Sequence, residues 1–392
     1  MRTIRALAIV ATGLMCTACG GGGGGASSPP PSSPPPPPST PQLPDAASAP
    51  ALKTIFAPDF RVGAAVAVGH VDPTTRAADA ALIQKHFSTL TPENAMKADT
   101  IGIAEGQYNF GPADQIVAFA QANGIAVRGH ALVWHQITPD WFFAGDTGDP
   151  ASYHAEVKRR LETYVRDVVT HFKGKLYAWD VVNEVAGDGP GQVYRTNSNW
   201  YQAYSVGGNG ADYIEDAFRA ARAADPDVKL FINDYATDNP AKRANLLAIV
   251  RDLMDKGVPL DGVGHQFHLT MAVPASNVDA ALTEFEQLNP ALINQVTELD
   301  LSIYTDSTSD YGTAGPPLSA LSQQAQRYRD LFAVFRKHEA SIDSVTMWGV
   351  SDAETWLDHW PTTRKDRPLL FDTNRQPKWA FWAVVDPALR LP

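Results

Sequence analysis

Two glutamates stand at the ends of strongly apolar runs of the chain. Glu184 follows the segment 179–183 (WDVVN), and Glu298 lies within the segment 296–300 (VTELD). Hydrolysis of a glycosidic bond needs two carboxyl groups, because one protonates the leaving oxygen while the other attacks the sugar carbon or activates water. A single glutamate of this kind would most often form a surface salt bridge. Two of them, each in an apolar strand beside an amide or a carboxyl residue, favour catalysis.

Neighbouring residues could position this pair. His268 is a candidate partner for Glu298, because a hydrogen bond from its ring would stabilise the carboxylate. Asp300 lies two residues after Glu298, on the same face of a strand, and could hold the other ring nitrogen. Asn183, directly before Glu184, could donate to a sugar hydroxyl next to the reacting carbon. His268 could instead be a core histidine whose hydrogen bonds are satisfied.

The elements that must carry these residues alternate in type from about residue 51 onward. Alternation of short β-rich runs with amphipathic helical runs predicts parallel strands joined by right-handed crossovers. The predicted strands are Val62–Val68, Ser88–Thr91, Ala126–Trp134, Tyr177–Asn183, Lys229–Asn233, Gly262–Leu269, Asn294–Asp300 and Ser344–Val350. The predicted helices include Pro112–Asn123, Tyr153–Phe172, Tyr213–Ala224, Ala241–Lys256, Val278–Leu288 and Leu318–His338.

About eight such units in the globular segment fit a closed barrel. The prediction is therefore an α/β fold, a (β/α)8 TIM barrel with a single catalytic domain. An open doubly wound sheet would require a Gly-rich phosphate loop after its first strand, and the segment 66–70 (VAVGH) is not one. Polar residues cluster at the C-terminal ends of nearly all predicted strands, which is the rim where barrel enzymes place their chemistry.

Seven motifs in this order resemble glycoside hydrolase family 10, the endo-β-1,4-xylanases. They are TPENAMK at 91–97, RGHALVWH at 128–135, WDVVNE at 179–184, FINDY at 231–235, GVGHQFH at 262–268, TELD at 297–300 and WGVSD at 348–352. The resemblance covers the segment from about Phe60 to Asp386. One motif alone would be weak, but a chance match to all seven is not credible.

The resemblance implies a retaining enzyme with Glu184 as acid/base and Glu298 as nucleophile, and with His268 and Asp300 as the pair that orders the nucleophile. It implies that residues on the non-reducing side of the cut hold xylose units, namely Glu93, Asn94, Lys97, His130, Trp134, Asn183 and Gln266. Trp348 and Trp356 would form the aromatic walls there. The pattern is broken after His135, where Gln136 comes first and Ile137 fills the place of the family's glutamine.

Charge and cysteine content restrict the partners. The formal net charge is −11 and no Lys/Arg-rich run is present, which argues against nucleic acid. Both cysteines lie in the first twenty residues, so the rest of the chain has no disulfide and no thiolate metal site. The histidines lack the spacing of metal ligands. We expect no metal and no cofactor, and a monomer that acts on xylan and xylo-oligosaccharides, as the resemblance implies.

The first fifty residues have the composition of an export signal and a linker. Two arginines precede a short apolar run that ends at Cys16-Thr17-Ala18-Cys19, which resembles a bacterial lipoprotein signal with Cys19 as the lipidated residue. Residues 20–50 are rich in Gly, Pro and Ser and predict a disordered linker. The predicted layout is a signal at 1–19, a linker at 20–50 and a catalytic domain at 51–392.

This layout predicts secretion across the inner membrane and a lipid anchor at the bacterial outer membrane or cell surface. Cys16 stands where the lipoprotein motif usually has Leu, which leaves ordinary secretion to the periplasm or the exterior as the alternative. Two alternatives to the xylanase also stay open. One is a related barrel hydrolase on another β-1,4-glycan, and the other is a non-catalytic surface protein that binds glycans.

Overall fold

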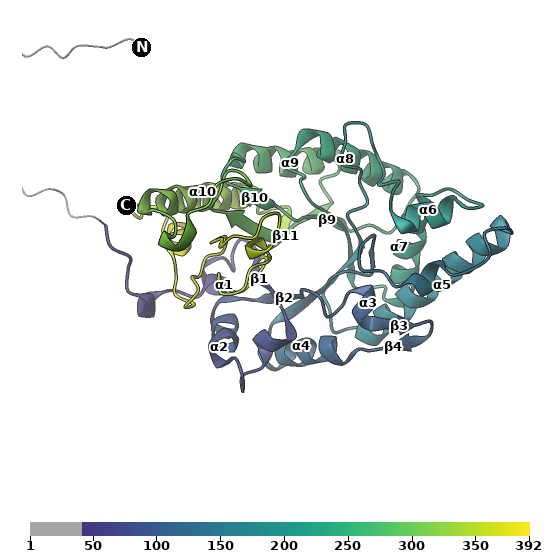
Figure 1. Ribbon diagram of the computed structural model, residues 1–392, viewed down its shortest axis with the longest axis horizontal. Helices are drawn as coiled ribbons and strands as arrows, with labels where there is room; N and C mark the ends of the chain where they lie inside the picture. Colours follow the sequence, from purple (N-terminus) through teal and green to yellow (C-terminus); the bar gives the residue numbers. More distant parts are fainter. Residues whose placement is uncertain (1–40) are drawn as a thin grey trace, which may run out of the picture. The chain divides into compact units, whose positions relative to one another are not determined.

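Eight parallel strands close into a barrel in the computed structural model, which describes residues 41–392 (Figure 1). They are β1 (Arg61–Val66), β2 (Thr89–Pro92), β5 (Ala126–Gly129), β7 (Ala178–Asn183), β8 (Lys229–Asp234), β9 (Gly262–His265), β11 (Ile293–Ser302) and β12 (Ile342–Met347). Each strand pairs with its neighbours in parallel, and β12 pairs back with β1. The predicted (β/α)8 barrel is confirmed, and the open sheet is excluded.

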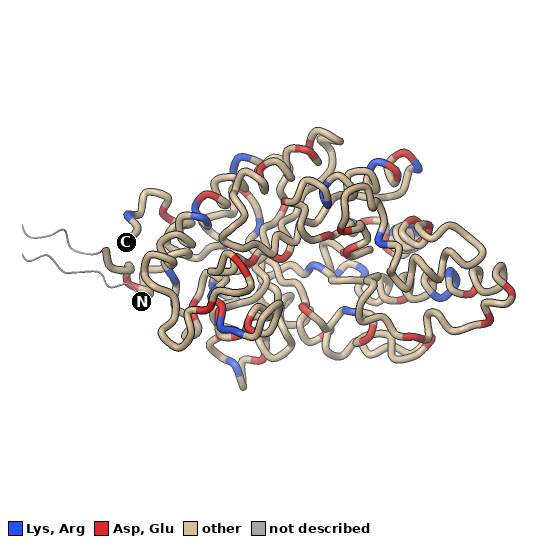
Figure 2. The backbone as a smooth tube through the Cα atoms, turned by 45° about the horizontal axis from the view of Figure 1, so that its top comes forward, with Lys and Arg blue, Asp and Glu red and all other residues tan. Residues whose placement is uncertain are grey.

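The larger helices lie outside the ring of strands (Figure 1). They are α2 (Ala77–His86), α4 (Gly111–Ala122), α5 (Pro150–Phe172), α7 (Asp212–Ala224), α8 (Pro240–Asp255), α9 (Ala275–Leu288) and α10 (Leu318–Lys337); the shorter helix α11 (Trp379–Val385) follows near the C-terminus. Side-chain capping residues followed by proline determine where two of these helices, α5 and α8, begin. Asp149 caps the backbone N–H of Ser152 ahead of Pro150, and Asn239 caps that of Ala241 ahead of Pro240. Acidic and basic residues are interspersed along the chain (Figure 2).

Shorter elements fill the connections. They are α1 (Leu52–Ile55), α3 (Ala98–Ile101), α6 (Asn199–Ser205), the hairpin of β3 (Gly102–Ala104) and β4 (Gln107–Tyr108), and five 3₁₀ helices at Ala46–Ser48, Val68–Val71, Asp140–Phe143, Gly312–Ala314 and Trp356–Asp358. The last of these 3₁₀ helices carries one of the predicted aromatic walls, Trp356. Within residues 41–392, no helix combines the length and the apolar character that a membrane crossing requires.

Two predicted strands are interrupted at the rim. The run Ala126–Trp134 divides into β5 and β6 (Val133–Trp134), and the run Gly262–Leu269 divides into β9 and β10 (His268–Thr270). Phe267 at the second break has a positive φ of 51°, which takes the backbone out of the extended conformation. These breaks separate the part of each strand that packs in the core from the part that presents polar side chains at the rim.

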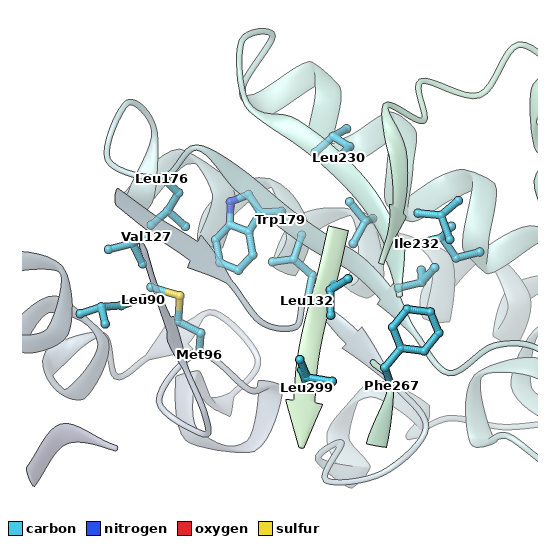
Figure 3. Packing of buried hydrophobic residues seen from close by; sticks show 14 of the residues in the cluster. Leu90, Met96, Val127, Leu132, Leu176, Trp179, Leu230, Ile232, Phe267 and Leu299 are labelled. Carbon is cyan, nitrogen blue, oxygen red and sulfur yellow. The ribbon is translucent and has the colours of Figure 1, made fainter. Parts of the chain in front are cut away.

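The core lies between the barrel and the helices, and Figure 3 shows part of it. Trp179 on β7 is 1% exposed, as its place inside a predicted strand suggests. Trp379 and Trp382 on α11 are also buried. Trp382 belongs to the main core, whereas Trp379 packs with Ala325 of the neighbouring helix α10 and not against the barrel. The globular part of the chain has no disulfides, so its stability depends on the removal of apolar surface from water. Large buried aromatic side chains of this kind contribute much of that stabilisation.

Ordered structure begins before the predicted domain boundary at residue 51. Asp45 caps the 3₁₀ helix Ala46–Ser48, and the side chain of Ala49 is buried in the core. Residues 41–50 belong to the same compact unit as the barrel, although the Gly/Pro/Ser-rich composition of the segment 20–50 as a whole placed them in the linker. The predicted signal at 1–19, including Cys19, and linker residues 20–40 lie outside the described residues.

Candidate active site

A cleft of about 620 Å³ opens at the rim formed by the C-terminal ends of the strands. It is lined by Glu93, Lys97, His130, Trp134, His135, Gln136, Asn183, Glu184, Arg195, Tyr235, Ala236, Gln266, His268, Glu298, Trp348, Trp356 and Trp360. All predicted site residues of the barrel except Asn94 and Asp300 are in this set. Parallel strands in a closed barrel end at one rim, which brings together residues that lie more than 200 positions apart in the sequence.

Glu298 is buried on β11, with only 4% of its surface exposed. His268 Nε2 lies 3.1 Å from Glu298 Oε2, and Asn233 Nδ2 donates to Oε1 at 2.8 Å. Burial favours the protonated form, but the bond from His268 and the other donors outweigh it and hold the pKa of Glu298 at about 2. The carboxylate is therefore ionised at neutral pH, as an attacking group must be.

His268 stands between two carboxylates. Its Nδ1 lies 2.9 Å from Asp300 Oδ2, and Asp300 Oδ2 also accepts the indole N–H of Trp356 at 2.7 Å. Burial lowers the pKa of His268, but the charge of Asp300 and the bonds to both carboxylates raise it to about 10. The ring is therefore an imidazolium that donates one hydrogen bond to Asp300 and one to Glu298. Asp300 lies beneath the cleft, where it fixes the orientation of His268.

Glu184 adopts a positive φ of 59° directly after β7, a conformation that costs free energy in a residue with a side chain. Gln266 Nε2 donates to its Oε1 at 3.2 Å, and His135 Nδ1 lies 3.8 Å from its Oε2. Burial and the charge of Arg195 lower the pKa of His135 to about 4, so this ring is neutral at neutral pH. His135 therefore places no positive charge beside the carboxyl group of Glu184.

The side-chain amide of Asn183 connects the two carboxyl groups. Its Oδ1 accepts from Asn233 Nδ2 at 2.8 Å and from Gln266 Nε2 at 3.2 Å. Asn233 continues to Glu298 and Gln266 continues to Glu184, so a chain of three amides fixes the two carboxyl groups relative to each other. Because both bonds engage Oδ1, the Nδ2 group of Asn183 remains to donate to a sugar hydroxyl.

Gly264 on β9 makes room for this chain. A Cβ atom at Gly264 would lie 2.2 Å from Asn233 Oδ1 and 2.9 Å from Thr297 Cγ2. The hydroxyl of Thr297 donates to the same Asn233 oxygen at 2.7 Å, which orients the amide nitrogen toward Glu298. A side chain at Gly264 would therefore displace the amide that bridges the site.

A charged cluster beside Glu184 was not predicted from the sequence. Arg195 Nε donates to the Glu184 carbonyl at 2.8 Å, and its NH2 group donates to Tyr235 Oη at 2.6 Å. Asp188 accepts from Tyr235, Lys242 and Arg195. Burial raises the pKa of Asp188, but the hydrogen bonds from Tyr235 and Lys242 and the charges of Lys242 and Arg195 outweigh burial and hold this pKa at about 2. Arg195 and Asp188 come from the loop after β7, where no periodic pattern marks them. Only Tyr235, which ends the FINDY motif, carried a signal in the sequence.

The predicted sugar-binding residues on the other side of the cleft differ in burial. Lys97 is only 8% exposed, with Nζ 4.8 Å from the ring centre of Trp134, so it is not a solvated lysine at a helix start. Asn94 is exposed and does not line the cleft; its Oδ1 accepts from Lys97 Nζ at 2.9 Å. Asn94 thus positions Lys97. His130 bonds to the buried Asp180 at 2.9 Å and stands edge-on to Trp348.

The two residues at the break in the motif after His135 are placed differently in the structure. Gln136 lines the cleft, whereas Ile137 is 45% exposed and has a positive φ of 50°. Gln136 is thus the residue of the two that can reach a ligand. No group of three or more residues with metal-ligand chemistry occurs within residues 41–392.

The family model for glycosyl hydrolase family 10 matches residues 51–387 of the chain. The chain belongs to glycosyl hydrolase family 10. Family 10 enzymes act with two glutamates and retain the configuration of the sugar carbon, in agreement with a cleft whose two glutamates are linked by fixed amides.

Named relatives and solved structures agree with this assignment. A "Beta-1,4-xylanase" of Dictyoglomus thermophilum is 43% identical over 86% of this chain and 90% of its own length. An "Endo-1,4-beta-xylanase A" of Thermotoga maritima is 42% identical over 88% of this chain, but the chain spans only 31% of that longer protein. The crystal structure of xylanase B from Clostridium stercorarium F9 superimposes with a TM-score of 0.80 at 42% identity, over 86% of this chain and 100% of that one.

We expect a His268→Asn substitution to move the acid limb of the pH–rate profile. Loss of the imidazolium removes the group that keeps Glu298 ionised, so the pKa of Glu298 rises toward its ordinary value. The ionised form is the reactive one, so activity is then lost at a higher pH as the pH falls. The midpoint of the acid limb of kcat/KM on an aryl glycoside should rise by about 1–2 pH units.

His338 provides a matched control for this experiment. Its two ring nitrogens lie 2.8 Å from Glu286 and 2.8 Å from Asp279, outside the cleft. A His338→Asn variant thus loses an imidazole held between two carboxylates without touching Glu298, and its acid limb should not move. A lower kcat in His268→Asn with an unchanged acid limb would show that His268 does not set the pKa of Glu298.

Proposed function

We propose that this family 10 protein is a retaining endo-β-1,4-xylanase. The observation that carries the proposal is the pair Glu184 and Glu298 in one cleft, joined through Asn183 by hydrogen-bonded amides and with different partners on each carboxyl group. Glu298, held ionised by His268, is the nucleophile. Glu184, next to the neutral His135, is the acid/base.

The reaction follows from these assignments in two displacements. Glu298 attacks the sugar carbon while Glu184 donates its proton to the glycosidic oxygen, and the leaving sugar departs. Glu184, now ionised, removes a proton from water, which attacks the same carbon and releases Glu298. Two inversions at one carbon retain its configuration. Asn183 Nδ2 donates to a hydroxyl of the sugar that is attacked, and this bond can strengthen as charge develops there.

The substrate is xylan and the products are xylo-oligosaccharides, which the names of the relatives from Dictyoglomus and Thermotoga support. Glu93, Lys97, His130, Trp134, Gln266, Trp348 and Trp356 contact the sugars on the side of Glu298. A second candidate substrate has support from one relative, a "Thermostable celloxylanase" of Thermoclostridium stercorarium that is 41% identical over 86% of this chain. Cellulose or cello-oligosaccharides would then be cleaved as well.

Reducing-sugar release from xylan, cellulose and mannan distinguishes these functions. We expect xylan to be cleaved with the highest kcat/KM. Cleavage of cellulose or mannan in preference to xylan would replace the proposed substrate with another β-1,4-glycan. Binding of xylan without any release of sugar would indicate a glycan-binding protein that lacks catalysis.

We also propose that Cys19 is lipidated and anchors the enzyme at the bacterial outer membrane or cell surface. The support is the small residues Thr17-Ala18 before Cys19 and the glycine run after it. A Cys19→Ala variant of the full chain is then expected to leave the membrane fraction, because the lipid chains are the only anchor proposed. The measurement is xylanase activity in membrane and soluble fractions, together with the mass of the mature N-terminus.

Cys16 supplies the control for the anchor, since it lies three residues before Cys19 in the same segment. A Cys16→Ala variant should remain in the membrane fraction with a lipidated N-terminus. A Cys19→Ala protein that stays wholly membrane-bound, or a mature N-terminus elsewhere, would contradict the anchor and favour ordinary secretion.

A further inference from the structure

Trp360 differs from the other two tryptophans that follow β12 at the rim. Trp348 is 8% exposed and stands edge-on to His130, and Trp356 packs against the ring of His268 and donates its indole N–H to Asp300. Trp360 also lines the cleft but is 61% exposed. Of the large hydrophobic side chains that are exposed in residues 41–392, it is the only aromatic one.

Burial in the fold does not explain this side chain. A tryptophan stabilises a protein when its large apolar surface is removed from water, and most of the surface of Trp360 remains in water. No aromatic stacking or cation–π partner of its ring occurs within residues 41–392. A single exposed apolar residue is ordinary, but this one lies in the wall of a cleft that binds sugars.

The segment that carries Trp360 is fixed at several points. The backbone N–H of Trp360 donates to the Trp356 carbonyl at 3.2 Å. Thr362 Oγ1 donates to the Ser307 carbonyl at 3.1 Å, and the guanidinium of Arg364 lies 3.7 Å from the ring centre of Tyr304. The backbone that carries the indole is therefore anchored to the segment after β11, which lowers the conformational entropy lost when the indole binds a ligand.

The position of Trp360 along the cleft identifies the part of the substrate that it faces. The acid/base Glu184 lies next to the oxygen of the bond that breaks, so the leaving sugars lie on its side. The sugar attacked by Glu298, and those attached to its non-reducing end, lie on the other side. Trp356 contacts His268, the partner of Glu298, and Trp360 follows one turn later. Trp360 is thus on the non-reducing side.

We propose that Trp360 is a stacking platform for a further xylosyl unit on the non-reducing side, beyond the units next to Trp348 and Trp356. A pyranose ring presents a flat face of C–H groups that packs on an indole, and Trp360 combines a position in the cleft lining with 61% exposure. The inference rests on the proposed function, because it takes the substrate to be a β-1,4-xylan chain. If Trp360 binds this further unit, kcat/KM depends on the length of the substrate chain, although Trp360 lies outside the reacting centre.

The test compares two aryl glycosides with the same leaving group, an aryl xylobioside and an aryl xylotetraoside. The readout is the ratio of kcat/KM for the longer substrate to kcat/KM for the shorter one. Trp360→Ala should lower this ratio about tenfold, because only the longer chain reaches the platform. Trp360→Phe should keep most of the ratio, because it retains an aromatic face.

Ile103→Ala is the matched control, because Ile103 is 62% exposed and does not line the cleft. Its ratio should equal that of the unmutated enzyme. An unchanged ratio in Trp360→Ala would overturn the proposal, whether both rates stay constant or both fall equally. So would a Trp360→Phe ratio as low as that of Trp360→Ala.

Running the aryl cellobioside and cellotetraoside in parallel separates this inference from the proposed function. If the unmutated enzyme cleaves the cello-series and not the xylo-series, the xylanase proposal fails. The stacking role is then judged by the ratio within the cello-series, by the same criteria.

Discussion

A Glu298→Ala substitution is expected to abolish cleavage of xylan, with a fall in kcat on the order of 10⁵-fold. The carboxylate that forms the covalent intermediate is absent in this variant. His268 and Asn233, the donors that stabilise the carboxylate, remain in place. The fold should persist, since a small side chain replaces a larger one at the rim.

Azide should partly restore cleavage of an activated aryl glycoside by this variant. A small anion can occupy the space of the missing carboxylate, where the imidazolium of His268 favours negative charge. It then attacks from the same face as Glu298 did, in one displacement, so the glycosyl azide has inverted configuration. Proton NMR of the product at the sugar carbon measures this directly.

Glu162→Ala serves as the control, because Glu162 is a half-exposed glutamate on α5 outside the cleft. Its activity should match that of the unmutated enzyme, and azide should have no effect. A glycosyl azide of retained configuration from Glu298→Ala would refute the nucleophile assignment. Inverted product from the unmutated enzyme would refute the retaining mechanism while leaving the fold intact.

The effect of Glu184→Ala is expected to depend on the leaving group. Xylan needs a proton on its departing oxygen, so kcat on xylan should fall by about 10²–10⁴-fold. An aryl xylobioside with a good leaving group needs no such proton, and its first step should survive. The glycosyl-enzyme should then accumulate, because no base activates water for the second step. A rapid burst of the aryl alcohol followed by slow turnover is the expected signature.

Azide distinguishes this variant from Glu298→Ala. It should attack the accumulated glycosyl-enzyme from the face opposite Glu298, so the product has retained configuration. Opposite configurations from the two variants would assign both carboxyl groups. If the Glu184→Ala variant lost the same factor in kcat on xylan and on the activated substrate, and showed no burst, an acid/base role for Glu184 would be contradicted.

The sequence by itself determined the fold and much of the candidate site. Strand and helix patterns alternate along the sequence, which predicts parallel strands with helical crossovers. About eight such units fit a closed barrel, so the sequence predicted this fold. Residues at the end of a predicted buried strand could then be placed at the rim without knowing any contact. Glu184, Glu298 and His268 were found by this rule, and the cleft contains all three.

Only the tertiary structure decided what lies in loops and how rim residues contact one another. Arg195 and Trp360 come from irregular segments, and irregular segments carry no periodicity that would orient a side chain. Asn94 follows a strand, as Glu93 does, yet Asn94 does not line the cleft and instead accepts a hydrogen bond from Lys97, which does. The amide of Asn233 reaches both Asn183 and Glu298 because Gly264 leaves room for it. That approach depends on the closure of the barrel, which brings together strands far apart in the sequence.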